Sequence, residues 1–433
     1  MAAGMFLYDM LSFDKKNTWD PSKRLPNHKT LNYKQSIEKE PNLISEKLRN
    51  SVVFYDYQSI FPERLTLAFI RSAADYGAEV SNYSEVIDFS YENSDTVNGV
   101  IVKDHISGQT AEYKAPLIVN CGGTWADKIL EKAAKNKSIS HEVKRSEGIH
   151  VITDKIAGDH VVSLQKKDGT HMMIMPWRNH SIIGTTDKEY HGSPDNYRVS
   201  KASIDEVIND VNSHYGKKIS YKNIKHVYGG LRPLVDDQTE GSYSSSRKYE
   251  VYDNREDGLS GLITVEGGKY TTSRNLAKTV INLVAEKLNR KIDSSVTHSL
   301  YLAGSEIRNM KEFMKKQQLH YTDFSKETVE YISRNYGTLS KDVFQIARDN
   351  KAYAKVVSHD GELLAEAVYA VQKESARSLK DILLRRTGIG TLGHPGKEIL
   401  ETTAQTAAHL LDWGDEKTQD EINTTEAYFK LPE

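Results

Sequence analysis

With 433 residues, the chain exceeds the usual single domain of about 100–200 residues, so two or three cooperating domains are expected. Its hydrophobic fraction of 38% and charged fraction of 27% are ordinary for a globular protein and exclude gross disorder. A formal net charge of −2, without a long basic run, excludes a whole-molecule field that attracts nucleic acid. The single cysteine, Cys121, excludes an intramolecular disulfide, and no tight His or Cys cluster predicts a metal site.

The first 20 residues lack the basic flank, apolar stretch and small-residue cleavage site of a signal peptide. No apolar run approaches the ~20 residues that a bilayer-spanning helix needs. We therefore expect a cytoplasmic protein in a reducing compartment. Contact with the membrane could only be peripheral, on its inner face.

The first third of the chain has the mixed pattern of an α/β domain. Residues 4–13 predict a helix, and residues 51–55 predict a short strand. Apolar residues recur near helical spacing from 62 to 76, and Gly77 then provides a C-cap. The strand-like run 78–83 completes a predicted β-α-β unit.

Strand patterns dominate the middle of the chain. A Ser107-Gly108 turn signal between two strand-like runs predicts an antiparallel hairpin, and residues 115–120 predict a buried strand. Four further runs predict a substantial antiparallel sheet, at 148–153, 161–164, 171–175 and 181–184. A helix at 204–215 is expected to flank this sheet. From about residue 306 onward the pattern is helical, which is typical of an all-α domain.

Two predicted strands end in paired glycines and lead into helices. In ITVEGGKYTTSRNLAKTVI (263–281), the glycines allow a ligand to approach the backbone, and the following helix N-terminus favours an anion. An ordinary strand-turn-helix with a solvated Lys269 has the same local pattern. The second turn lies in IVNCGGTWADKI (118–129). Two such turns at strand ends favour a nucleotide cofactor across the edge of a parallel sheet.

Basic residues stand among apolar ones in the predicted antiparallel sheet. Arg232, in GGLRPLVDD, either pairs with an acid such as Asp236 or receives an anionic substrate. His150, in RSEGIHVIT, fits either a hydrogen-bonded core histidine or a catalytic base. Nothing near Cys121 marks it as an activated nucleophile, so it is expected to be a small core residue.

In their order along the chain, these segments resemble the FAD-dependent glycerol-3-phosphate dehydrogenase family, which includes related oxidases. A lone GGK is a weak signal, whereas the ordered set covers almost the whole chain. The resemblance is carried by FLYD (6–9), ERLTLAFIRSAADYGAEVSNY, APLIVNCGGTWADKI, RSEGIHVIT, IMPWRNHSIIGTTDKEYHGSP, VYGGLRPLVDD, ITVEGGKYTTSR and KDILLRRTGIGTLGHPG.

The resemblance implies an α/β fold with a glutathione-reductase-type FAD-binding domain, an antiparallel β substrate domain and a C-terminal all-α domain. Placed on this sequence, the FAD-binding domain takes 1–142 and returns over 256–295. The substrate, or cap, domain takes 143–255. The helical domain takes 296–433.

Members of the family begin with a strand, G-x-G-x-x-G and a helix that cradle the FAD pyrophosphate. No such segment precedes Met1, so we expect an N-terminally truncated FAD-binding domain whose remaining strands have unpaired edges. The match at 388–393 follows a helical run and leads into His394-Pro395, which predicts a turn rather than a dinucleotide site.

The resemblance also implies a reaction. Glycerol 3-phosphate is oxidised at its C2 hydroxyl to dihydroxyacetone phosphate, with hydride passing to flavin N5. Arg232 and Lys269 would flank the reacting carbinol, and His150 would accept a proton from the hydroxyl or orient it. The implied substrate contacts are Arg247 on the phosphate, with Thr185, Thr186 and Asp187 shaping the pocket. The implied flavin-lining residues are Gly122, Gly123, Trp125, Asp127, Gly267, Gly268, Lys269, Thr271 and Thr272.

Two alternatives stand beside this interpretation. An amino-acid oxidase of the same flavoenzyme superfamily is disfavoured by the set Arg232, Arg247 and Lys269, which suits a phosphate. An inactive fragment, or a phospho-ligand-binding relic unable to hold FAD, would explain the absent fingerprint. The expected electron acceptor is a quinone or oxygen, and a homodimer is an open alternative to a monomer.

Overall fold

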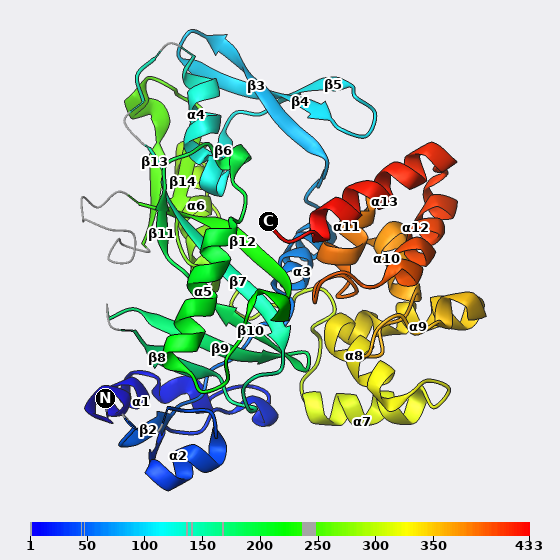
Figure 1. The fold of residues 1–433 in the computed structure, drawn as a ribbon. Helices are drawn as coiled ribbons and strands as arrows, with labels where there is room; N and C mark the ends of the chain where they lie inside the picture. The colour runs from blue at the N-terminus through cyan, green and yellow to red at the C-terminus, as the bar shows by residue number, and fades with distance from the viewer. Residues whose placement is uncertain are drawn as a thin grey trace.

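The computed structural model describes residues 2–44, 46, 48–135, 137–139, 142–166, 169–235 and 248–433. Within these ranges, four β-sheets belong to the first two thirds of the chain and a helical domain forms the remainder, as Figure 1 shows. The architecture confirms the predicted α/β class with an antiparallel sheet and a C-terminal all-α domain. No helix in the described ranges has both the length and the apolar character that crossing a bilayer requires.

The largest sheet is antiparallel and confirms the strands predicted for the middle of the chain. Strand β7 lies at its centre, with β12 on one side and β10 and β11 on the other. Helix α5 packs its apolar face against the sheet and buries Ile204, Val207 and Val211 in a shared core. The elements are β7 (Lys144–Asp154), β8 (Val162–Gln165), β9 (His171–Trp177), β10 (His180–Gly184), β11 (Lys188–Tyr190), α5 (Lys201–His214) and β12 (Ile224–Leu234).

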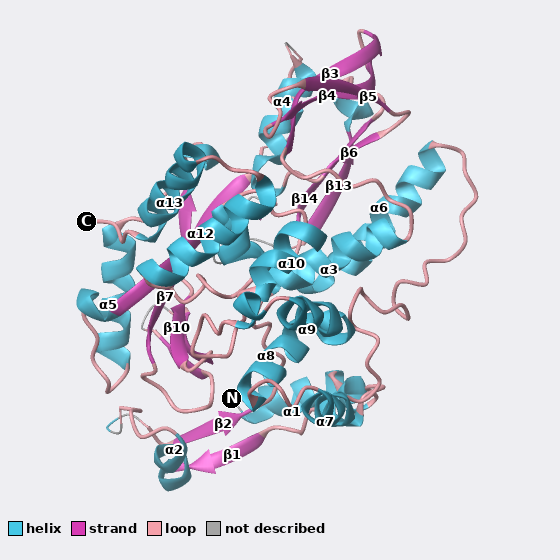
Figure 2. Cartoon of the chain, turned by 90° about the vertical axis from the view of Figure 1, so that its right-hand side faces the viewer, coloured by secondary structure: helices cyan, strands magenta, loops and turns pink. Residues whose placement is uncertain are grey.

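A smaller sheet contains the two strands that end in paired glycines. Strands β6 (Ile118–Asn120) and β14 (Leu262–Gly267) are parallel, and β13 (Tyr249–Asp253) pairs antiparallel with β14. Because β6 and β14 are parallel, their glycine turns lie at the same edge of the sheet. Helices α4 (Ala126–Ala134) and α6 (Ser273–Lys287) follow the two turns, and Figure 2 shows α6 beside these strands. Among the described strands, β6 pairs with β14 alone.

The remaining N-terminal elements form two small sheets and three helices. The predicted strand near 51–55 is β2, and β4 and β5 confirm the predicted hairpin. The elements are α1 (Ala2–Leu11), β1 (Lys29–Asn32), α2 (Tyr33–Lys39), β2 (Asn50–Val53), α3 (Pro62–Asp75), β3 (Ser84–Asn93), β4 (Thr96–Asp104) and β5 (Thr110–Lys114).

The predicted strand at 78–83 is wrong, and with it the β-α-β unit. The backbone NH of Ala78 bonds back to Ala73 O and caps α3, while the Asn82 side chain bonds to Ser375 O in the helical domain. Strand β3 begins only at Ser84 and pairs antiparallel with β4. The local apolar pattern could not reveal that this segment's hydrogen bonds go to a helix end and to a distant domain.

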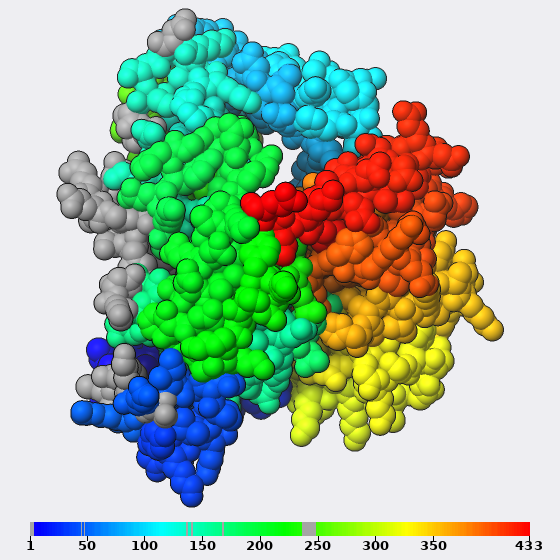
Figure 3. Space-filling view, in the orientation of Figure 1, coloured from blue at the N-terminus to red at the C-terminus, as the bar shows by residue number. Residues whose placement is uncertain are grey.

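The C-terminal domain is helical throughout, as predicted. Its segment at 388–393 is a turn, as predicted, and it follows a π-helical turn rather than a strand. The C-terminal tail crosses to the large sheet domain, visible in Figure 3 as the red segment against the green one. The helices are α7 (Met310–His320), α8 (Lys326–Tyr336), α9 (Ser340–Asp349), α10 (Ala365–Lys373), α11 (Leu379–Asp381), a π-helical turn (Ile382–Arg386), α12 (Lys397–Leu411) and α13 (Asp415–Phe429).

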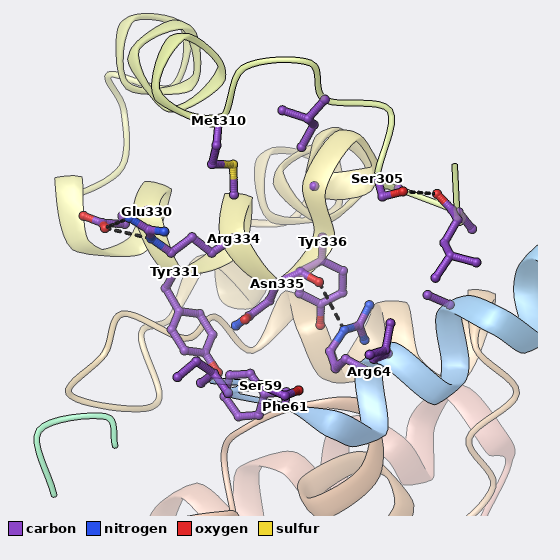
Figure 4. Close-up of a pocket in the computed structure, with 18 of the residues that line it drawn as sticks. Ser59, Phe61, Arg64, Ser305, Met310, Glu330, Tyr331, Arg334, Asn335 and Tyr336 are labelled. Carbon is purple, nitrogen blue, oxygen red and sulfur yellow. Dashed lines mark hydrogen bonds and ion pairs between the residues drawn. The ribbon is translucent and has the colours of Figure 1, made fainter. Parts of the chain in front are cut away.

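Buried arginines from two other parts of the molecule fasten the helical domain in place. Arg64 of α3 makes two hydrogen bonds of 2.9 Å to the carboxylate of Glu374. Its Nε donates to the backbone carbonyl of Asn335, and its guanidinium lies over the Tyr336 ring (Figure 4).

Arg178, between β9 and β10, provides the second fastening. It donates to Asp360 at 2.5 Å, to Glu362 at 2.8 Å and to the Gly388 carbonyl at 2.7 Å. Its side chain is only 4% exposed, and that of Glu362 is fully buried. Because each buried charge is paired and hydrogen-bonded, these contacts can be accommodated between the domains.

Loss of the Arg178 cation should therefore be costly. We expect Arg178→Leu to lower the free energy of unfolding by about 3–5 kcal/mol, because it leaves Glu362 buried without its partner. Arg334→Leu is the matched control: it breaks the exposed pair with Glu330 and should cost about 0–1 kcal/mol. Urea unfolding followed by tryptophan fluorescence measures both. Equal effects of the two substitutions would contradict the proposed fastening.

Candidate active site

Arg232 and His150 lie on neighbouring strands at the centre of the large sheet. In the antiparallel register, Arg232 of β12 pairs with Ser146 of β7, Gly230 pairs with Gly148, and Tyr228 pairs with His150. Direct cross-strand partners point to the same side of a sheet, so Arg232 shares a face with Ser146. His150 lies four residues after Ser146 on β7, and side chains four apart on a strand point to the same side. Arg232 and His150 therefore share one face. A Cβ at Gly148 would collide with the guanidinium of Arg232, which shows that this side chain lies over the glycine.

The loop after β10 supports the guanidinium from the other side of β7. Arg232 donates to Thr185 Oγ1 at 2.5 Å and to the backbone carbonyl of Thr186 at 3.2 Å. Thr186 Oγ1 accepts a 3.0 Å hydrogen bond from the backbone NH of Ile149. The Ser146 hydroxyl donates to Asp187 at 2.5 Å. Thr185, Thr186 and Asp187 therefore lie beside Arg232, where the sequence analysis expected the substrate pocket.

His150 is a neutral base in this setting. Burial, followed by the positive charge of Arg232, lowers the pKa of His150 from 6.5 to about 4. At neutral pH its imidazole therefore carries no charge and keeps one ring nitrogen free to accept a proton or a hydrogen bond. Arg247 and Asp236, which the sequence analysis also named, lie outside the residues that the structure describes.

The Gly267-Gly268 turn touches the end of the strand that carries Arg232. Both glycines have left-handed backbone angles, with φ of 70° and 95°. A Cβ at Gly267 would lie 2.6 Å from Lys248 O and 2.8 Å from Val235 Cγ2, so a side chain is excluded there. Since Val235 directly follows β12, the turn lies against the end of that strand.

A cavity of about 360 Å³ opens at the start of α6, beside this turn. Lys248, Lys269 and Arg274 bring positive charge to it, and the helix N-terminus adds its free backbone NH groups. Lys269 thus faces a hollow that Arg232 and His150 do not line in the described part of the chain. The lining residues are Lys248, Tyr249, Lys269, Thr271, Thr272, Arg274 and Asn275.

The first glycine turn is held by side chains on three elements. The backbone NH of Gly122 donates to Asn120 Oδ1 at 3.0 Å, and Trp125 Nε1 donates to Asp195 at 2.8 Å. Gly123 has a φ of 56° and open space where a Cβ would stand. Asp127 is buried and receives a 2.5 Å hydrogen bond from Arg145 of β7, so it acts on this turn through that arginine.

Sequence reasoning missed several charged residues of the site. Arg145 binds Asp127 and, through Nε, the backbone carbonyl of Thr124 at 3.0 Å. Lys248 and Arg274 bracket the GGK turn, and the basic flanks of KYEVYDN and YTTSR could have suggested them. The residues at this sheet edge suit a nucleotide cofactor, because glycine backbone without side chains, a helix N-terminus and several cations lie close together there. The Gly122–Trp125 and Gly267–Thr272 turns are the segments that would hold FAD.

The amino-acid sequence matches two known protein families and several glycerol-3-phosphate dehydrogenases. Residues 11–274 match the FAD dependent oxidoreductase family, and residues 295–418 match the C-terminal domain of alpha-glycerophosphate oxidase. The glycerol-3-phosphate dehydrogenase of Mycobacterium leprae is 30% identical over 436 residues, which cover 99% of this chain and 71% of that protein. The aerobic glycerol-3-phosphate dehydrogenase of Staphylococcus saprophyticus is 27% identical over 401 residues, covering 89% and 68% of the two chains.

The fold also has a counterpart among crystal structures. The glycerol-3-phosphate dehydrogenase of Bacillus halodurans, determined in complex with FAD, superposes with a TM-score of 0.79 at 26% sequence identity. The superposition covers 93% of this chain and 79% of that one.

The charge state of His150 can be tested directly. At about pH 5.5, a unit below the ordinary histidine pKa of about 6.5, the His150 imidazole should still be neutral. Arg232→Gln should raise its pKa, because the neighbouring cation is removed. NMR titration of the imidazole signals measures this. His226, whose pKa burial alone lowers to about 4, serves as the reference in the same spectra. A shift of both histidines, or of neither, would contradict the electrostatic effect of Arg232 on His150.

Proposed function

Because the chain belongs to the FAD-dependent glycerol-3-phosphate dehydrogenase family, we propose that it oxidises glycerol 3-phosphate to dihydroxyacetone phosphate. The observation that carries this proposal is the pairing of a fixed guanidinium, Arg232, with a neutral imidazole, His150, on one face of the large sheet. An alcohol oxidation needs these two functions beside the reacting carbon: a positive charge and a proton acceptor.

The two residues would act together on the C2 hydroxyl group. His150 accepts the hydroxyl proton at its free ring nitrogen, and Arg232 stabilises the negative charge that develops on the oxygen. The C2 carbon then gives up its hydrogen with the electron pair as the C=O bond forms. FAD, when bound, supplies the acceptor for that hydride. Thr185 and the carbonyl of Thr186 keep the guanidinium in place while the charge develops.

Cations around the second glycine turn suit a phosphate group, of the cofactor or of the substrate. Lys248, Lys269 and Arg274 line the cavity at the start of α6, where an ammonium group would be repelled. Arg247 remains the proposed phosphate contact, and bidentate binding by arginine suits a phosphate monoester. The proposed flavin-binding set is Gly122, Gly123, Trp125, Gly267, Gly268, Lys269, Thr271 and Thr272, together with the buried Asp127.

The electrons are proposed to leave for a quinone or for oxygen, the two acceptor classes that dehydrogenases and oxidases of this kind imply. We further propose that the protein works in the cytoplasm, with any membrane association confined to peripheral contact at the inner face. Homodimerisation would not alter the roles assigned above, because Arg232 and His150 come from one sheet of one chain.

Two neighbouring glycines allow the role of Arg232 to be tested without changing it. Gly148→Ala should displace the guanidinium, because its new Cβ would occupy the same space. The displaced guanidinium would lose its charge-assisted hydrogen bonds to the reacting oxygen, which contribute ~1.5–3 kcal/mol. In the FAD-loaded protein, kcat/KM for glycerol 3-phosphate should therefore fall by about 10- to 100-fold. The displaced group is the flexible end of a side chain, so the melting temperature should change little.

Gly230→Ala is the matched control, since Gly230 is the cross-strand partner of Gly148 and its Cβ would meet no atom of the described residues within 4 Å. It should retain nearly full activity. Steady-state kinetics with an artificial electron acceptor measures both variants. Full activity in Gly148→Ala would show that Arg232 has no role in the reaction.

A further inference from the structure

Glu266 is a buried carboxyl group that the proposed reaction does not use. It lies on β14 directly before Gly267, at the start of the second glycine turn. The residue is 3% exposed, and its Oε1 has no hydrogen-bond partner among the residues that the structure describes. A lone ionised carboxylate in such a place loses its hydration without compensation, so the neutral acid is favoured.

Its charged neighbours are mostly of the same sign. Glu250 of β13 is the direct antiparallel partner of Glu266, which sets two carboxyl groups side by side. Asp127 approaches from α4, and Arg145 of β7 is the one cation that acts on the group among the described residues. Burial, then Asp127 and Glu250, raise the pKa of Glu266 from 4.5 to about 7 against the opposing effect of Arg145.

Arg145 is already committed to other partners. It donates to Asp127 at 2.5 Å, to the Thr124 carbonyl at 3.0 Å and to the Val143 carbonyl at 2.9 Å. Through these bonds it ties the first glycine turn to the start of β7. The Arg145 guanidinium therefore binds Asp127 directly and acts on Glu266 through its charge, while its bond to the Thr124 carbonyl holds the first glycine turn.

We propose that Glu266 is a positioning residue that acts by binding a proton. When Glu266 is protonated, Arg145 keeps its bonds to Asp127 and to the turn at Gly122–Trp125. In its ionised form Glu266 competes with Asp127 for Arg145 and loosens that turn. The inference rests on the proposed function only in taking the turn as flavin-lining. The proton equilibrium and its effect on the turn are independent of FAD.

The sign of the pH effect follows from the raised pKa. Between about pH 4.5 and pH 7 the folded protein holds a proton that the unfolded chain releases, so stability falls as pH rises through this window. Glu266→Gln cannot ionise and should escape this loss. Its melting temperature should be close to that of the wild type at about pH 5 and higher by on the order of 5 °C at about pH 8. An offset that is the same at both pH values would overturn the proposal.

A second readout reports on the turn itself. At about pH 8, amide hydrogen exchange at Gly123–Trp125 should be faster in the wild type than in Glu266→Gln, because only the wild type can ionise at this position. Equal exchange rates would show that ionisation does not reach the turn. Neither measurement needs FAD, so failure here is distinct from failure of the proposed function.

Glu250→Gln keeps the inference testable should Glu266→Gln not fold. Glu250 is exposed, and its loss removes one repelling carboxylate, so Glu266 should ionise at lower pH. Infrared titration of the protonated carboxyl band should show one component near pH 7 that moves down in this variant. The component from Glu366, whose buried carboxyl has a pKa raised to about 8, should stay in place. A band that Glu250→Gln leaves unchanged would overturn the assignment.

Discussion

The position of the Arg232 guanidinium over Gly148 is the constraint on which the rest of the site depends. It requires a glycine on β7 and the direct pairing of that residue with Gly230 on β12. The same strand carries Arg145 at one end, where it holds the first glycine turn, and His150 near the middle. Strand β7 thus joins the proposed cofactor-binding edge to the proposed proton acceptor. A one-residue slip in its register would move each side chain of the strand to the other face of the sheet.

The helical domain contacts the same two strands, on the face of the sheet that carries His150. Tyr228, the cross-strand partner of His150, donates a 2.5 Å hydrogen bond to the carbonyl of Thr391 in the 388–393 turn. Arg178 binds that turn through Gly388 and Thr391. The glycine-rich segment that resembles a dinucleotide fingerprint therefore serves as a docking point for the large antiparallel sheet. The buried arginine pairs and the proposed site are consequently parts of one connected structure.

The sequence predicted most elements because their patterns are local. Strand alternation around His150 and helical spacing from 62 to 76 both correspond to observed elements. The strand expected at 78–83 failed because its hydrogen bonds go to a helix end and to Ser375, far away in the sequence. Glu266 was missed for a similar reason. From the sequence alone, a glutamate before a GGK turn is expected to be exposed to solvent. Its burial, its pairing with Glu250 and the nearby charge of Asp127 depend on the folded structure. The role of Arg145 was likewise not predictable, because its partner Asp127 lies 18 residues away in the sequence.

Anaerobic mixing of the FAD-loaded protein with glycerol 3-phosphate tests the proposed function most directly. We expect the visible absorbance of the flavin to bleach on addition of glycerol 3-phosphate and to persist on addition of a small amino acid. Bleaching by the amino acid instead would assign the chain to the amino-acid oxidases. Protein that stays colourless after incubation with FAD, yet still binds inorganic phosphate, would contradict the account and identify a phospho-ligand-binding relic.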